Sequence, residues 1–208
     1  MSFIKEREEV AYWMRRLYEQ KLTSCSGGNV SFRTSDGHVL ITASQIDKAR
    51  IEAKNICVIS PVWKNLTPEL KPSMETTMHL AIYQKNDNVK AIVHAHPPKA
   101  TAWACCETLL TNNLTGEARY LLGIIAKAEY KLMGSPELAS EVSKYTISHA
   151  AVLLANHGAL CTGDSLFQAF DRMEVLENLA EISMYARIIK KKDNLSAAEL
   201  KKIDKFLL

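Results

Sequence analysis

Two histidines separated by one residue form the most informative motif of the sequence. His94 and His96 come at the end of an apolar, β-branched run, Val89–His94, which is typical of a buried strand. Side chains two residues apart on a strand point to the same face of the sheet, so the two imidazoles are placed as a pair of metal ligands. His157 follows a second expected strand, and three protein ligands with one open position are usual for catalytic zinc. The pattern therefore favours a three-histidine metal site.

Two alternatives to a catalytic metal site stay open on the residues alone. A His-x-His pair on a strand often only forms hydrogen bonds or faces solvent, and by itself it is a weak motif. A purely structural zinc site would use four ligands rich in cysteine. Cys105 and Cys106 are the only cysteines placed near the histidines, and they are expected in the core of a helix.

Glu75 is the candidate acid–base group. It is expected in the first turn of a helix opened by Pro72 and Ser73, where an acid complements the helix dipole. The functional interpretation is a carboxylate beside a metal-bound substrate, which the metal keeps ionised while partial burial raises its pKa. Both interpretations are compatible with the sequence.

Glycine and hydroxyl residues at the ends of expected elements are candidates for binding phosphate. Gly28 and Asn29, in a Gly-Gly-Asn run, offer backbone N–H groups that no bulky side chain obstructs, and Ser44 and Ser73 add hydroxyls. Each of these features alone is no more than a turn or a cap. The run does not match the Walker or dinucleotide-binding fingerprints.

The elements that must position these residues are helices and strands in irregular alternation. Asp36-Gly37 is a strong hairpin turn between strands at 30–33 and 38–42. Residues 109–132 give no clear pattern. This order favours an α/β fold in which helices cover a mixed sheet, rather than a regular parallel barrel. The other expected elements are strands at 56–60, 89–94 and 151–155, and helices over 10–18, 73–85, from 98, over 136–149, from a cap at Asp164, and from a capping box at Ser196.

The composition fits one globular domain over residues 1–208. Hydrophobic residues make up 47% and charged residues 24%, and a net charge of +3 is too small to indicate a nucleic-acid or membrane partner. The one dense basic run, Lys190–Lys192, is expected to be a solvated helix end. Five cysteines without a C-x-x-C motif fit a reducing compartment, and no signal peptide or membrane span is recognisable. We expect a cytoplasmic protein.

Five short segments together resemble the class II aldolase/adducin family, in that family's order and spacing and over most of residues 1–185. Each segment is weak alone, but the set is highly specific. The segments are Ser26-Gly27-Gly28-Asn29-Val30-Ser31, Ile41-Thr42-Ala43-Ser44, Lys71-Pro72-Ser73-Met74-Glu75, His94-Ala95-His96-Pro97 and Asn156-His157-Gly158-Ala159.

The resemblance implies a three-layer α/β/α sandwich around a largely antiparallel sheet, assembled as a homotetramer with active sites between subunits. It implies one zinc ion per subunit and a small phosphosugar substrate. The implied zinc ligands are His94, His96 and His157, with Glu75 as acid–base group and candidate fourth ligand, and the implied phosphate ligands are Gly28, Asn29, Ser44 and Ser73.

Within the family, two segments are similar to methylthioribulose-1-phosphate dehydratases. Residues Ser44–Lys48 match their serine-to-lysine segment, and Lys71–Thr76 is likewise close to their pattern. Glu117 falls about where those enzymes keep a catalytic glutamate, although related aldolases can also carry an acid there. Fuculose-phosphate aldolases usually have glycine in place of Gln45 and serine in place of Met74. The resemblance thus implies dehydration of 5-methylthioribulose 1-phosphate, a step of methionine salvage, as the first expectation.

Three other functions stay open. Aldol cleavage of L-fuculose 1-phosphate would use the same zinc-stabilised enediolate, with Glu75 returning the proton, whereas dehydration would use Glu117 for proton transfer. A pentose-phosphate 4-epimerase needs another acid–base pair, which the sequence does not identify. An adducin-like, non-catalytic module is disfavoured because its domains lack the complete histidine set.

Overall fold

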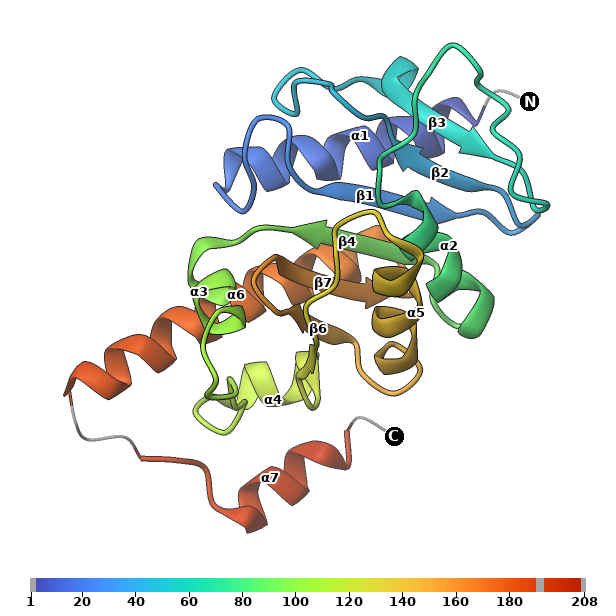
Figure 1. The fold of residues 1–208 in the computed structure, drawn as a ribbon. Helices are drawn as coiled ribbons and strands as arrows, with labels where there is room; N and C mark the ends of the chain where they lie inside the picture. The colour runs from blue at the N-terminus through green and yellow to red at the C-terminus, as the bar shows by residue number, and fades with distance from the viewer. Residues whose placement is uncertain (1–2, 190–192, 207–208) are drawn as a thin grey trace.

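The structure, a computed structural model, describes residues 3–189 and 193–206 of the chain (Figure 1). Lys190–Lys192, the expected helix end, lie outside the described residues. One seven-stranded sheet has the strand order β3-β2-β1-β4-β7-β6-β5. All neighbouring pairs are antiparallel except β5 and β6, which are parallel. The strands are β1 (Asn29–Arg33), β2 (Val39–Thr42), β3 (Ile56–Ile59), β4 (Ala91–Ala95), β5 (Ala126–Ala128), β6 (Ala151–Leu154) and β7 (Gly158–Gly163).

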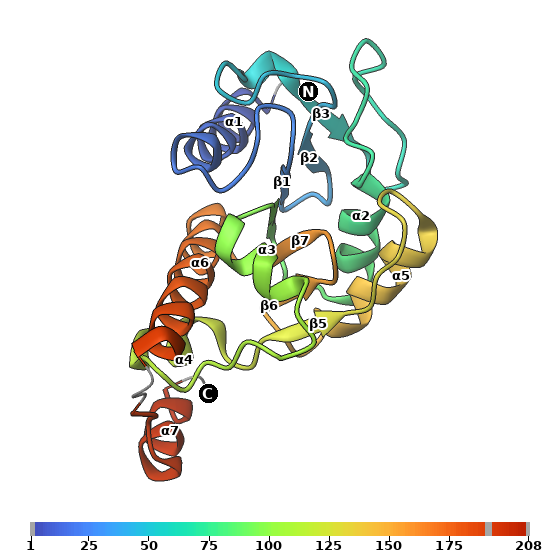
Figure 2. The same ribbon diagram turned by 60° about the vertical axis from the view of Figure 1, so that its left-hand side comes forward.

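Helices cover both faces of the sheet, which confirms the predicted three-layer α/β/α sandwich (Figure 2). Helices α1, α3, α4 and α6 pack on one face, and α2 and α5 pack on the other. The helices are α1 (Ile4–Glu19), α2 (Thr76–Lys85), α3 (Pro98–Ala104), α4 (Gly116–Leu122), α5 (Pro136–Tyr145), α6 (Leu166–Ile189) and α7 (Ala197–Asp204), with a 3₁₀ turn η1 at Ala53–Asn55.

The alternation of side chains along the central strand β4 decides which face carries the chemistry. Ala91 and Val93 pack into the core under α1 and α6, whereas Ile92 packs into the core under α2 and α5. Because the period of a strand is two, His94 lies on the same face as Ile92. The histidine is thus directed toward α2, the helix that follows Glu75.

Helix α2 begins later than the sequence predicts. It starts at Thr76 with Glu75 as the N-cap residue, so Glu75 precedes the first turn and Ser73 is not the cap. The reason is a backbone bridge between Ala43 and Pro72, which keeps the chain extended until just before Ser73. The shift places Glu75 at the N-terminus of α2, as its N-cap residue.

Other boundaries also differ from the predicted ones. Helix α5 ends at Tyr145 instead of near 149, and Ser165, not Asp164, caps α6 by accepting a hydrogen bond from the backbone of Gln168. Strand β7 was not predicted, and the unreadable region 109–132 contains α4 and β5. The hairpin at Asp36-Gly37 is confirmed.

Among the described residues, no helix combines the length and apolar character needed to cross a lipid bilayer.

Candidate functional site

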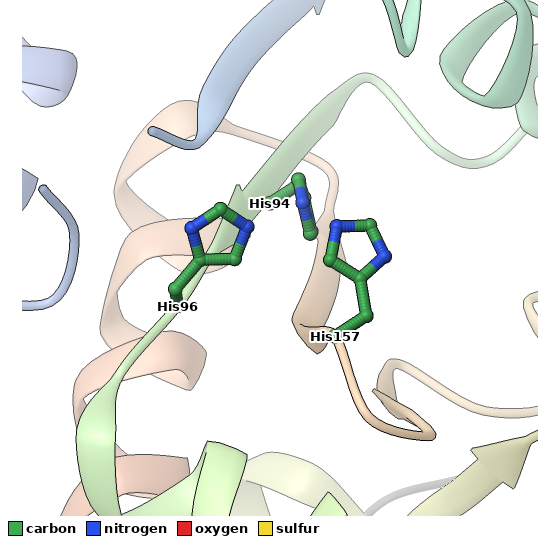
Figure 3. Close-up of side chains that lie close together, drawn as sticks. All are labelled: His94, His96 and His157. Atoms are coloured by element: carbon green, nitrogen blue, oxygen red, sulfur yellow. The ribbon is translucent and has the colours of Figure 1, made fainter. Parts of the chain in front are cut away.

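The three predicted histidines lie together at one end of the central strands (Figure 3). His94 lies on β4, His96 follows the end of that strand, and His157 lies in the tight turn between β6 and β7. Because β7 pairs with β4, the turn brings His157 beside the other two. One potential ligand atom from each imidazole lies within 4.8 Å of the others.

His94 is held in a fixed orientation by the neighbouring strand. Its Nδ1 lies 2.9 Å from the carbonyl oxygen of Ala159, so this nitrogen donates a hydrogen bond. A neutral imidazole with a proton on Nδ1 has a free lone pair on Nε2, which is the atom offered to the cluster. Backbone carbonyls orient many metal-binding histidines in this way.

Glu75 faces two of the three imidazoles. Its Oε2 lies 2.9 Å from Nε2 of His94, and its Oε1 lies 3.4 Å from Nε2 of His157. Burial raises the pKa of the Glu75 carboxyl, but His94, His157 and a hydrogen bond from Asn29 outweigh burial, and the pKa lies below its usual range. Glu75 is therefore an ionised carboxylate within the cluster.

The protonation of the histidines suits a cation at their centre. Burial and the neighbouring imidazoles lower the pKa of His96 to about 4, and they lower the pKa of His157 as well. Burial also lowers the pKa of His94, but the Glu75 carboxylate and the Ala159 carbonyl outweigh it and leave this pKa raised. A positive charge is thus favoured between Glu75 and His94, where either a proton or a metal ion supplies it.

Several buried polar atoms of the cluster have no hydrogen-bond partner among the described residues. They include Nε2 of His96 and Nδ1 of His157, and Oε1 of Glu75 has only the 3.4 Å contact to His157. Buried polar atoms are normally hydrogen-bonded, so a group of orphaned atoms calls for a bound species. Imidazole nitrogens with a carboxylate oxygen are the donor set that a divalent transition metal takes, so the residues fit such an ion.

A ladder of hydrogen bonds connects Glu75 to the interior. Asn29 and Ser31 lie two apart on β1 and share one face, while Glu75, His79 and Tyr83 lie four apart along α2 and share one side. Asn29 Nδ2 donates to Glu75 Oε2 at 3.0 Å, and His79 Nε2 lies 2.6 Å from Asn29 Oδ1. Ser31 Oγ lies 2.7 Å from His79 Nδ1 and 2.8 Å from the Tyr83 hydroxyl.

The ionised Glu75 sets the direction of every bond in this ladder. A carboxylate only accepts, so Asn29 must present its amide N–H to it and its carbonyl oxygen to His79. His79 then donates from Nε2 and accepts the Ser31 hydroxyl proton at Nδ1. Burial lowers the pKa of His79 to about 3, which keeps the imidazole neutral, as this pattern requires.

A cavity of about 190 Å³ opens beside the histidines. It brings the four predicted phosphate-binding residues together with His96, His157 and Glu75. Its walls are Ser26, Gly27, Gly28, Asn29, Ala43, Ser44, Lys48, Ser73, Met74, Glu75, His96, Met133 and His157.

At two positions near the histidines the backbone of β4 approaches so closely that only glycine fits. A Cβ on Gly28 would lie 2.8 Å from the carbonyl oxygen of His94, and its φ of +66° is unfavourable for other residues. A Cβ on Gly158 would lie 2.5 Å from the carbonyl oxygen of Ala95 and 2.7 Å from Cδ2 of His96. Both glycines therefore let neighbouring strands meet beneath the histidines.

The structure does not bring Glu117 to this cavity. Glu117 is exposed in the first turn of α4 and lines a separate hollow with Pro98, Lys99 and Glu177. Its role in proton transfer stays a prediction. Asn29 lines the cavity, but its amide is already bonded to Glu75 and His79. Its contact with phosphate stays a prediction.

His79, four residues after Glu75 on a helix, is expected from the sequence to be a packed group beside the ligands and not a ligand, and its contact with Asn29 agrees with this. Sequence reasoning gave no role to three other residues of the site, Ser31, Tyr83 and Lys48. Ser31 and Tyr83 had a readable signal, because Asn29 and Ser31 are two apart on a strand and Glu75, His79 and Tyr83 are four apart in sequence. Lys48 belongs to the Ser44–Lys48 segment, but its burial depends on the turn between β2 and η1. At Gln45, where fuculose-phosphate aldolases usually carry glycine, φ is +59°, a conformation that favours glycine.

Comparison with known proteins agrees with this architecture. Residues 8–184 match the family described as Class II Aldolase and Adducin N-terminal domain. The chain is 35% identical over 186 residues to a 3-oxo-tetronate 4-phosphate decarboxylase of Haemophilus influenzae, covering 88% of each chain. It is 35% identical over 167 residues to an L-fuculose phosphate aldolase of Methanococcus maripaludis, covering 80% of this chain and 89% of that one.

A solved structure of an L-fuculose 1-phosphate aldolase matches this fold with a TM-score of 0.90 at 32% identity, over 100% of this chain and 98% of that chain. Relatives of this identity and coverage make the chain an enzyme, which sets aside the non-catalytic, adducin-like alternative. The chain belongs to the class II aldolase and adducin family.

Proposed function

We propose that this enzyme is a metal-dependent lyase that breaks a carbon–carbon bond of a small phosphorylated ketose or 3-oxo acid. The observation that carries the proposal is the convergence of three imidazoles and an ionised Glu75 on a cavity lined by Gly28, Ser44 and Ser73. The histidines and Glu75 suit a carbonyl group that must bear negative charge, and the glycine and serine residues suit a phosphate.

The compounds named in the relatives share one reactive species. Loss of CO₂ from 3-oxo-tetronate 4-phosphate leaves a carbanion next to the 3-oxo group, and retro-aldol cleavage of a 1-phosphoketose leaves one next to its C2 carbonyl. In both cases the species is the enediolate of dihydroxyacetone phosphate. A single site that stabilises this enediolate would serve either reaction, because only the leaving fragment differs.

A divalent metal ion would be held by His94, His96 and His157. Zinc is the ion that this set of ligands suits. Bound there, it supplies Lewis-acid stabilisation of negative charge on the carbonyl oxygen. His94 is oriented for this task by Ala159, and the lowered pKa of His96 keeps that imidazole unprotonated at neutral pH.

Glu75 is the proposed proton carrier. Its ionised carboxylate accepts a proton, and in the protonated form it returns one to the enediolate carbon after the bond has broken. In aldol cleavage, the proton lost by the C4 hydroxyl balances the one returned to carbon, and in decarboxylation the proton comes from water. Asn29 holds the carboxylate in place throughout, since its amide is fixed by His79.

The phosphate would be bound by the glycine and serine residues of the cavity. Gly28 has no side chain to cover its backbone, and Ser44 and Ser73 add hydroxyls to the cavity wall. Ser73 Oγ already accepts a hydrogen bond from the backbone N–H of Glu75 at 3.3 Å, which leaves its proton for a phosphate oxygen.

Dehydration of 5-methylthioribulose 1-phosphate remains a prediction from the segments Ser44–Lys48 and Lys71–Thr76 and from the position of Glu117. Its candidate proton donor, Glu117, lines a different hollow from the histidines. The relatives described above carry the names of carbon–carbon lyases. These observations favour carbon–carbon cleavage. The homotetramer implied by the resemblance likewise stays a proposal, which light scattering of the purified protein tests.

The experiment is a substrate comparison with purified, zinc-loaded enzyme. Three compounds are tested in parallel: 3-oxo-tetronate 4-phosphate, L-fuculose 1-phosphate and 5-methylthioribulose 1-phosphate. We expect dihydroxyacetone phosphate from one or both of the first two, measured by enzymatic reduction. Loss of water from the third, without carbon–carbon cleavage of the others, would replace this proposal with the dehydratase.

A further inference from the structure

We propose that Lys48 is the cationic partner of the substrate's phosphate and determines the cavity's selectivity for phosphorylated compounds. The inference rests on the proposed function in one respect, namely that the substrate carries a phosphate. It adds a charged residue to a binding site that otherwise offers only neutral donors.

Lys48 is a buried lysine at the wall of the cavity. Its side chain is almost fully buried, with 2% of the residue exposed, and it lines the cavity together with Ala43 and Ser44. Its Nζ donates a hydrogen bond to the carbonyl oxygen of Ala43 at 3.1 Å. An ammonium has three N–H donors, so one carbonyl does not satisfy it.

Lys48 has no anionic partner within residues 3–189 and 193–206. The titratable groups that face it are the thiols of Cys25 and Cys57. Burial raises the pKa of Cys57 to about 11, and a hydrogen bond to Asp47 raises that of Cys25, so both thiols are neutral. The adjacent Asp47 instead contacts Arg50 and Cys25, at 3.7 Å and 3.4 Å.

A buried charge without a counter-ion is costly unless a ligand supplies that counter-ion. Burial lowers the pKa of Lys48 to about 8, which still leaves the ammonium form predominant at neutral pH. A phosphate in the cavity would regain the lost interaction energy. The lysine is thus poised to gain a partner when the anion binds.

The rest of the cavity needs such a charge. Lys48 is the only lysine or arginine among the described residues that line it. Glu75 lines the same cavity and contributes a negative charge, which repels a phosphate dianion. The glycine backbone and the serine hydroxyls are neutral donors, and charge-assisted hydrogen bonds are roughly twice as strong as neutral ones.

The test is calorimetric titration of the zinc-loaded, full-length protein with inorganic phosphate. In Lys48→Met, which keeps the length of the side chain, the dissociation constant should rise by roughly 10- to 100-fold, the effect of losing a charge-assisted hydrogen bond. The matched control is Lys64→Met, because Lys64 is an exposed lysine outside the cavity. It should bind phosphate as the wild type does, and both variants should retain zinc.

Lys48→Arg is the second variant and should bind phosphate more tightly than Lys48→Met. Equal phosphate affinity in wild type and Lys48→Met, or no phosphate binding by the wild type, overturns the inference. Titration with glycolate tests the other anion: if Lys48→Met weakens glycolate alone, the partner is a carboxylate and the proposal fails. Lys48-dependent phosphate binding in a protein that cleaves none of the substrates would leave this inference standing and refute the proposed reaction.

Discussion

Asn29 donates a hydrogen bond from Nδ2 to Oε2 of Glu75 at 3.0 Å, and this contact fixes the one ionised carboxylate of the histidine cluster. The amide keeps this orientation because its Oδ1 is 2.6 Å from Nε2 of His79. The position of Glu75 therefore depends on an imidazole that does not touch the cavity. A residue that positions Glu75 without contacting the substrate should affect kcat more than KM.

The first prediction concerns His79. Leucine at this position removes the donor to Asn29 Oδ1 and the acceptor of the Ser31 hydroxyl, so we expect about 1–3 kcal/mol lower stability. We also expect a lower kcat with little change in KM, because substrate binding does not involve His79. His79→Gln, which can still donate to Asn29, should restore part of kcat. The control is His149→Gln, since His149 lies outside the cluster. Equal losses of kcat in the leucine and glutamine variants would show that His79 only packs and does not position Glu75.

The second prediction concerns metal binding. Replacing His96 by alanine removes one of the three ligands, and we expect zinc affinity to fall by more than roughly 100-fold, beyond the usual effect of second-sphere changes. Zinc content after dialysis, measured by mass spectrometry, reports the loss. His38→Ala is the control because His38 lies outside the three-histidine cluster. Full zinc occupancy in His96→Ala would exclude this site.

The third prediction concerns Gly158. A methyl group there meets the carbonyl oxygen of Ala95 at 2.5 Å and the ring of His96 at 2.7 Å. We expect Gly158→Ala to cost about 1–3 kcal/mol, as overpacking does, and to weaken zinc binding by displacing His96. Gly116→Ala is the matched control, because its Cβ would have its nearest neighbour at 3.7 Å. Denaturant unfolding measures the free energy of unfolding of both variants. Similar values for Gly158→Ala and Gly116→Ala would contradict the close packing at Gly158.

The fourth prediction concerns the pH dependence of phosphate binding. Burial lowers the pKa of Lys48 to about 8, so its positive charge is present below that pH and lost above it. A phosphate monoester becomes a dianion above about pH 6. Affinity for a monoester such as glycerol 3-phosphate should therefore be highest between about pH 6 and 8 and should weaken as the pH rises through the pKa of Lys48. In Lys48→Met the decline above pH 8 should disappear, and its persistence would assign the titration to another group.

Local patterns predicted helices over a mixed sheet and the clustering of the three histidines, whereas the three-layer arrangement followed from the family resemblance. The period of two along β4 places His94 toward α2, and the hairpin at Asp36-Gly37 sets the register of β1 and β2. Long-range contacts escaped prediction. The bridge of Ala43 to Pro72 delays α2, and the exposed position of Glu117 depends on how α4 packs against α6.

The site shows the same division. The histidines were predicted because each lies in or just after a recognisable strand, whereas the burial of Lys48 comes from a turn whose conformation no local pattern reveals. The ladder from Glu75 to Tyr83 lies between these cases. The four-residue spacing of Glu75, His79 and Tyr83 is visible in the sequence. Only the structure shows that Asn29 and Ser31 of β1 face these residues.

The central claim is that Glu75 moves the proton, and a metal ion held by the three histidines stabilises the charge, when the enediolate of dihydroxyacetone phosphate is generated. The most direct test is to incubate the zinc-loaded enzyme with dihydroxyacetone phosphate in D₂O and follow the hydroxymethyl protons by NMR. We predict stereospecific exchange of one hydrogen for deuterium, lost in Glu75→Gln and after removal of zinc. No exchange by the wild type, or exchange that survives Glu75→Gln, would contradict the account.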